Sequence, residues 1–218
     1  MARLKVGVLI SGRGSNLQAL IDACAAPDFP AEIVLVVSNN VNAQGLERAH
    51  KAGIATKVID HRSFGGREAF DVAIDAALRR AEVELVCLAG FMRLLTPGFV
   101  AWWRDRIINI HPSLLPSFKG LHSHERALEA GVRLTGCTVH FVRAEMDDGP
   151  IIVQAAVPVH AGDDAERLAA RVLAVEHRIY PLALRLIAEG RVRVEGDVAA
   201  VDGPAPDTVL INPPDAGT

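Results

Sequence analysis

An asparagine and a histidine lie two residues apart in INIHPSLLPSFKG, the stretch that covers residues 108–120. Side chains at i and i+2 of a strand share one face, so Asn109 and His111 point the same way. Ile108 and Ile110 point to the opposite face. Pro112 lacks a backbone N–H and ends the strand. The pair thus lies at a strand's carboxyl end, where open α/β sheets bind ligands. It is either a reaction centre or a hydrogen-bonded polar plug in the sheet.

Two adjacent carboxylates follow in HFVRAEMDDGPII, after the strand that ends near Arg143. A carboxylate of Asp147 or Asp148 beside His111 would favour the charged imidazole. Asn109 could donate its amide to a developing oxyanion. No serine or cysteine is placed as an evident nucleophile, which favours direct acyl transfer between two bound substrates over a covalent intermediate. Taken alone, Asp147 in this Gly-Pro turn is better explained as a turn residue.

A glycine loop, SGRGSN, occupies residues 11–16 between the first predicted strand and the first predicted helix. Its backbone N–H groups and the helix dipole form an anion site. Leu17 replaces the third glycine of a dinucleotide fingerprint, and the second strand ends in SNN without the acidic residue that binds the ribose of NAD. We therefore expect a single phosphate on a small metabolite, with Ser15 and Asn16 as side-chain donors. The alternative is a glycine turn needed only for tight packing.

The elements that position these residues alternate along the first half of the chain. KVGVLI, EIVLVVSN, TKVID and ELVCLAG have the apolar runs of strands, and NLQALIDACA, AQGLERAHKAG and GREAFDVAIDAALRRA lie between them with helical patterns. After Gly90, three further strands follow in IINIHPS, LTGCTVHFV and IIVQAAVPV. The pattern predicts an α/β protein with a single Rossmann-like, doubly wound sheet, parallel in its N-terminal half with antiparallel additions in its C-terminal half.

A long helix is predicted over residues 163–188, with two aspartates at its start and Gly190 after its end. We expect residues 1–196 to form one catalytic domain. Residues 197–218 are predicted to start as a hairpin and to continue as a partly disordered tail rich in proline and glycine.

The composition excludes several classes of partner. With 23 basic and 26 acidic residues the net charge is −3, which gives no overall field for nucleic acid or an anionic membrane. The three cysteines are single and widely spaced, as in buried thiols of a reducing compartment. The first apolar run is too short for a signal sequence. These features predict a cytoplasmic protein that binds small molecules, with its oligomeric state left open.

Three further histidines require an assignment. His122 and His124 offer only two metal ligands, so we expect a loop near the substrate and no metal site. His140 lies in a β-rich run and either faces the site or is a hydrogen-bonded core residue.

Taken together, the motifs resemble those of the phosphoribosylglycinamide formyltransferase family over roughly residues 4–200. The matching stretches are SGRGSNLQALIDA, VVSN, GLERA, LAGFMRLL, INIHPSLLPSFKGLHSHERALEAG, TGCTVHFV, MDDGPII and VEHRIYPLAL. The resemblance implies the formyltransferase fold. It also implies transfer of the formyl group of 10-formyltetrahydrofolate, as cosubstrate, to the amine of glycinamide ribonucleotide in de novo purine (IMP) biosynthesis.

The resemblance also implies roles for individual residues. Asn109, His111 and Asp147 would be catalytic. The substrate phosphate would be bound by Gly14, Ser15 and Asn16, and the ribose by Glu176. The folate would contact Arg67, Met92, Arg93, Leu94, Leu95, Asn109, Arg143, Ala144, Glu145, Met146 and Asp147. Asp148 departs from the family, whose members often have glycine at this position.

Three alternatives remain. Methionyl-tRNA formyltransferases share NIHPSLLP but append a tRNA-binding domain, for which this chain shows no corresponding segment. Formyltetrahydrofolate hydrolases carry a regulatory module before the catalytic domain, whereas here the glycine loop begins at residue 11. A non-catalytic module that binds phosphorylated metabolites would explain the glycine loop but not the Asn, His and Asp residues.

Overall fold

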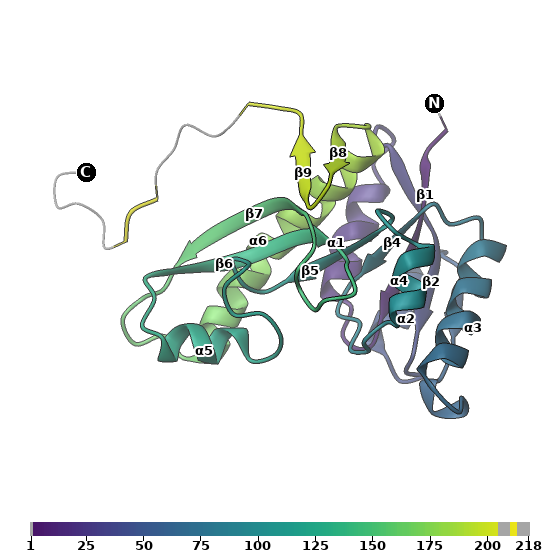
Figure 1. Cartoon of the computed structure of the whole chain (residues 1–218), viewed down its shortest axis with the longest axis horizontal. Helices are drawn as coiled ribbons and strands as arrows, with labels where there is room; N and C mark the ends of the chain where they lie inside the picture. Colours follow the sequence, from purple (N-terminus) through teal and green to yellow (C-terminus); the bar gives the residue numbers. More distant parts are fainter. Residues whose placement is uncertain (1, 205–209, 213–218) are drawn as a thin grey trace.

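A seven-stranded sheet in the order β3-β2-β1-β4-β5-β6-β7 forms the centre of the protein (Figure 1). The computed structural model describes residues 2–204 and 210–212. The strands are β1 (Leu4–Ile10), β2 (Ala31–Ser38), β3 (Thr56–Val58), β4 (Leu85–Leu88), β5 (Ile107–His111), β6 (Leu134–Phe141) and β7 (Ile151–Pro158). The first five strands are parallel, and β6 and β7 are antiparallel to their neighbours. The predicted fold class is therefore confirmed.

Helices cover both faces of this sheet. They are α1 (Ser15–Cys24), α2 (Gln44–Lys51), α3 (Arg67–Arg80), α4 (Pro97–Trp102), α5 (Ser123–Glu129) and α6 (Ala165–Ala188), with a 3-10 turn η1 (His61–Ser63). In β1, Val8 and Ile10 pack in one cluster with residues of α1, α2 and α6, while Leu9 packs with residues of α3 and α4 on the other face. Such burial on both faces explains the nearly continuous apolar run of β1.

The long helix α6 begins close to its predicted start. Asp164 is its N-cap and accepts a hydrogen bond from the backbone N–H of Arg167 at 2.8 Å. In the part of the chain that the structure describes, no helix is long and apolar enough to cross a membrane.

A separate two-stranded hairpin, β8 (Val192–Glu195) and β9 (Val198–Val201), follows α6. Gly196 has a φ of 63° in its turn, a conformation that glycine adopts without strain. The hairpin thus lies on both sides of the domain boundary predicted at residue 196. Residues 205–209 and 213–218 of the predicted tail lie outside the described residues.

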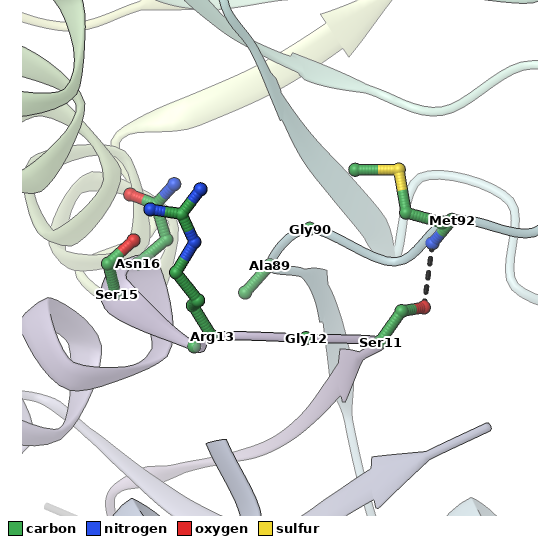
Figure 2. A pocket seen from close by; sticks show the side chains of 9 residues that line it. Ser11, Gly12, Arg13, Ser15, Asn16, Ala89, Gly90 and Met92 are labelled. Carbon is green, nitrogen blue, oxygen red and sulfur yellow. Dashed lines mark hydrogen bonds between the residues drawn. The ribbon is translucent and has the colours of Figure 1, made fainter. Parts of the chain in front are cut away.

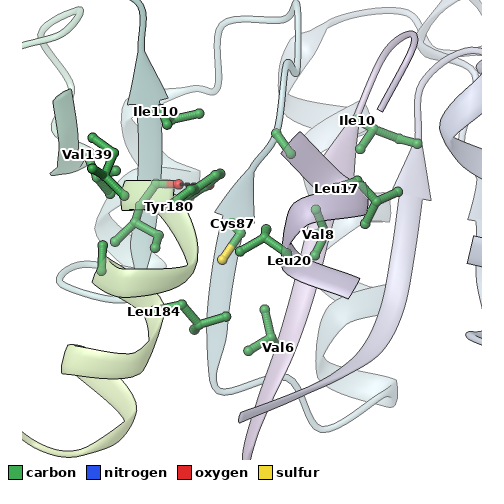
Figure 3. Packing of buried hydrophobic residues seen from close by; sticks show 14 of the residues in the cluster. Val6, Val8, Ile10, Leu17, Leu20, Cys87, Ile110, Val139, Tyr180 and Leu184 are labelled. Atoms are coloured by element: carbon green, nitrogen blue, oxygen red, sulfur yellow. Dashed lines mark hydrogen bonds between the residues drawn. The ribbon is translucent and has the colours of Figure 1, made fainter. Parts of the chain in front are cut away.

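Tyr180 of α6 links the helix to the strands that carry the site. Its hydroxyl lies among buried apolar side chains and donates to the backbone oxygens of Leu88 (3.0 Å) and Ile108 (3.2 Å), in β4 and β5 (Figure 3). Burial raises the pKa of this phenol well above its ordinary value, so the hydroxyl remains a donor.

Replacing this hydroxyl tests its contribution to stability. Tyr180→Phe keeps the ring and removes the donor, so we expect the free energy of unfolding to fall by about 1 kcal/mol. Denaturant titration measures this change, and turnover should stay within about threefold of wild type because the ring still supports both strands. An unchanged unfolding midpoint would mean that the hydroxyl contributes no net stability.

Candidate active site

The residues predicted to form the reaction centre lie where the parallel and antiparallel halves of the sheet meet. Asn109 and His111 lie at the carboxyl end of β5, and the antiparallel register places His140 of β6 directly opposite Asn109. Asp147 lies in the turn between β6 and β7, with a left-handed φ of 53°. The structure therefore brings together the three residues that the resemblance assigned to catalysis.

His111 has a hydrogen-bond acceptor beside each ring nitrogen. Its Nδ1 is 3.3 Å from Oδ2 of Asp147, and its Nε2 is 3.1 Å from the carbonyl oxygen of Phe118. A carbonyl and a carboxylate accept but do not donate, so these two neighbours call for an N–H on the ring nitrogen that faces each of them. The hydroxyl of Ser123 also lies 3.4 Å from Nε2. Donation from Nε2 to a substrate oxygen requires that this oxygen replace the Phe118 carbonyl. The ring is 6 % exposed, so water competes little for it.

The two neighbouring aspartates have different environments. The Asp147 side chain is 11 % exposed, and its Oδ2 also accepts the backbone N–H of Gly120 at 2.8 Å. The Asp148 side chain is 55 % exposed and forms an ion pair with Lys119. Because only Asp147 contacts His111, the geometry favours Asp147 over Asp148 as the acid that works with the imidazole.

His140 faces this centre, which the sequence alone left open. Its Nδ1 lies 2.9 Å from the carbonyl oxygen of Phe141, and its Nε2 lies 3.4 Å from Nδ2 of Asn109 and 3.9 Å from Oδ1 of Asp147. Burial is the main cause that lowers the pKa of His140, and the charges of His111 and Lys119 lower it further. The hydrogen bond to Phe141 and the charge of Asp147 oppose this shift. A neutral ring with its proton on Nδ1 accepts from Asn109 and fixes the orientation of that amide.

The glycine loop lies against α2 and opens α1. Gly14 has a φ of 70°, and a Cβ on it would lie 2.6 Å from the Cα of Gly45, so both conformation and packing require glycine. A cavity of about 220 Å³ lies beside the loop and is lined by residues 11–16 together with Ala89, Gly90 and Met92. Figure 2 shows how these residues surround it. The loop therefore has the packing role that was considered as the alternative, and it also lines a cavity at the N-terminus of α1.

Glu176 of α6 reaches the same end of α1. Its Oε2 accepts a hydrogen bond from Nδ2 of Asn16 at 2.7 Å, and both side chains are buried. Burial raises the pKa of Glu176, and the bond from Asn16 opposes this shift. The structure thus groups all four residues predicted for the phosphoribosyl part of a substrate.

The residues predicted to contact a folate differ in their exposure to solvent. Met92, Leu94 and Met146 are apolar and exposed by 70 %, 60 % and 55 %. By contrast, the guanidinium of Arg143 is nearly buried and donates to Oδ1 of Asp105 at 2.7 Å, so its charge is already paired. Arg67 is exposed at the first position of α3. Among residues 2–204 and 210–212 there is no group of three or more metal-ligating side chains.

Comparisons with known proteins agree with one another. The family model described as Formyl transferase matches residues 4–184. The phosphoribosylglycinamide formyltransferase of Escherichia coli (strain K12) is 48 % identical over 200 residues, which cover 92 % of this chain and 94 % of that protein. A crystal structure of glycinamide ribonucleotide transformylase 1 from Symbiobacterium toebii has a TM-score of 0.89 and 50 % identity, covering 91 % of this chain and 94 % of that one.

Longer relatives contain a similar region. The trifunctional purine biosynthetic protein adenosine-3 of Gallus gallus is 57 % identical over 192 residues, or 88 % of this chain and 19 % of that protein. The chain therefore spans about a fifth of the length of this trifunctional relative.

Proposed function

The chain belongs to the formyl transferase family, and we propose that it transfers the formyl group of 10-formyltetrahydrofolate to the amine of N1-(5-phospho-D-ribosyl)glycinamide. The products are the N-formyl nucleotide and tetrahydrofolate, in de novo purine biosynthesis. The comparisons confirm the resemblance to phosphoribosylglycinamide formyltransferases. The observation that carries the proposal is the 3.3 Å contact of His111 with Asp147, in a centre that also holds Asn109.

The phosphoribosyl group of the acceptor substrate fits the end of α1. Gly14, Ser15 and Asn16 would bind its phosphate with backbone N–H groups, the Ser15 hydroxyl and the positive end of the helix dipole. Glu176 would accept a hydrogen bond from the ribose, since only its Oε2 is engaged by Asn16. These contacts would place the glycinamide amine toward β5.

The donor fits the apolar side chains around the centre. 10-Formyltetrahydrofolate would supply the formyl group as cosubstrate. Its ring system would lie against Met92, Leu94 and Met146, whose exposed apolar surfaces otherwise face water. The backbone of residues 143–147 and the side chains of Arg93 and Leu95 would complete this contact, and Arg67 would lie near its acidic end. The proposed chemistry uses no metal ion.

The reaction requires charge stabilisation and proton transfer, and we propose that the buried residues Asn109, His111 and Asp147 supply both. Asn109 would use the amide hydrogen that does not face His140 to stabilise negative charge on the formyl oxygen. His111 would donate a second hydrogen bond to that oxygen. Asp147 would orient the imidazole, stabilise positive charge on it and pass the proton lost by the amine toward the departing nitrogen.

Two glycine variants separate substrate binding from folding. A Cβ added at Gly12 would meet no other atom within 4 Å, and its φ is not left-handed, so Gly12→Val should fold and project into the cavity. We expect its affinity for glycinamide ribonucleotide to fall at least about tenfold, because the valine side chain would occupy space beside the proposed phosphate site, with folate affinity nearly unchanged. Gly14→Val should instead lower the melting temperature, because its Cβ meets Gly45. Calorimetric titration of each ligand and thermal melting measure these effects, and equal loss of both ligands in Gly12→Val would contradict the assignment.

The direct test uses purified protein with both substrates and a metal chelator. The proposal expects one formylated nucleotide and one tetrahydrofolate per turnover, measured by mass spectrometry and by absorbance of the folate. Loss of the formyl donor with release of formate and no formylated nucleotide would support the hydrolase alternative. Binding of the nucleotide without any loss of the donor would support the non-catalytic alternative.

We also infer a cytoplasmic location and small-molecule partners. The three free, buried cysteines suit a reducing compartment, and the net charge of −3 favours neither nucleic acid nor an anionic membrane.

A further inference from the structure

The segment of residues 91–96, here called the donor segment, has no regular secondary structure although it would carry the folate contacts. Its two ends are attached to side chains that are distant in sequence. The backbone N–H of Met92 donates to Oγ of Ser11 at 2.8 Å, and the backbone N–H of Thr96 donates to Oδ2 of Asp71 at 2.7 Å. The side chains of Met92 and Leu94 extend from this segment into solvent.

Ser11 is itself fixed by a buried neighbour. Its hydroxyl donates to Oδ1 of Asn39 at 2.6 Å, and Asn39 is only 6 % exposed. A hydroxyl has a single hydrogen, so donation to Asn39 leaves the lone pairs of Ser11 for the Met92 N–H. The amide of Asn39 faces Nδ1 of His61 at 3.3 Å. The hydrogen-bond chain therefore runs from the start of η1 through the end of β2 to the donor segment.

Ser11 is also the first residue of the glycine loop. Figure 2 shows its side chain bonded to Met92 at one end of the cavity, while Ser15 and Asn16 lie at the other end. One short loop thus contacts both proposed ligand regions, the phosphate region through residues 14–16 and the folate region through Ser11.

We propose that Ser11 is a positioning residue that holds the donor segment beside the glycine loop in the conformation that binds the folate. This inference rests on the proposed function. The hydroxyl of Ser11 is engaged by Asn39 and by the backbone N–H of Met92, so Ser11 would act on the folate through that backbone.

Ser11→Ala and Ser15→Ala form a matched pair in the same loop. Removal of the Ser11 hydroxyl frees the Met92 N–H, so the KM for the folate should rise about three- to tenfold, as expected for one lost hydrogen bond. The KM for the nucleotide and kcat should stay within about twofold. Ser15→Ala should show the reverse pattern, with a higher KM for the nucleotide. Ser11→Thr keeps the hydroxyl and should retain the wild-type KM for the folate.

A second measurement does not depend on activity. Amide hydrogen exchange of Met92 should be slow in the wild-type protein and at least about tenfold faster in Ser11→Ala, because the N–H loses the Ser11 hydroxyl as its acceptor. Fast exchange of Met92 in the wild type would overturn the inference even if Ser11→Ala did not fold.

An unchanged folate KM in Ser11→Ala would overturn the positioning role. A rise in the nucleotide KM that equals or exceeds the rise in the folate KM would also overturn it. The same holds if Ser11→Thr behaves like Ser11→Ala. Failure of the wild type to form formylated nucleotide would instead count against the proposed function. The activity of the wild type is therefore measured before any variant is compared.

Discussion

Asp147→Asn should lower kcat by a factor of about 10² to 10⁴, the usual range for a lost general acid or base, with little change in ligand affinity. Asparagine keeps the shape of the side chain and tolerates the left-handed backbone at φ 53°, so the turn should be preserved. It can still accept the N–H of Gly120, but it removes the charge that lies 3.3 Å from His111. Single-turnover kinetics with saturating substrates measure the effect on chemistry.

Asp148→Asn is the control for this variant. It makes the same replacement of a carboxylate by an amide at the adjacent residue, but it breaks only the exposed ion pair with Lys119. Exposed pairs contribute little, so we expect less than about a threefold change in kcat. An active Asp147→Asn enzyme together with an inactive Asp148→Asn enzyme would assign the acid to Asp148.

Asn109 and His111 should respond differently to pH when each is replaced. Asn109→Ala removes one neutral donor, and kcat should fall by about 10² to 10³ with the shape of the pH profile retained. His111→Ala should lower kcat at least as much and should also remove or move one limb of the profile. The reason is that an amide keeps its donor hydrogens at every accessible pH, whereas the donor capacity of an imidazole depends on its protonation.

A pH series of kcat for the wild type and both variants measures this difference, with thermal melting to verify folding. Substrate affinities should change little in either variant. Wild-type turnover in Asn109→Ala, or an unchanged rate and profile in His111→Ala, would show that the pair is only a polar plug in the sheet.

The fold could be predicted because its strands and helices have strong local patterns. The apolar runs around Val8, Val36 and Val86 are buried on both faces of the sheet, so they lack polar alternation and indicate parallel strands. The prediction that Asn109 and His111 lie on one strand is also confirmed, and a regular strand fixes which side chains share a face.

The cross-strand and loop contacts could not be predicted from the sequence. The position of His140 opposite Asn109 depends on the register of β5 with β6, which local pattern does not specify across a long connection. The pairing of Arg143 with Asp105 arises from two loops that meet only in the folded chain. The short helix α5 begins at Ser123, inside the histidine pair that was expected to be a loop, because a helix this short has little periodicity.

The polar residues of the reaction centre all come from β5, β6 and the turn after β6, which form one continuous stretch of the chain. The contacts proposed for the acceptor's phosphoribosyl group come from elsewhere, from the loop before α1 and from Glu176 in α6. A gene segment that encodes residues 107–151 would thus carry all three residues proposed for catalysis, without the other proposed substrate contacts. Substitutions outside this segment would then change the recognition of the acceptor and leave the residues proposed for the transfer itself unchanged.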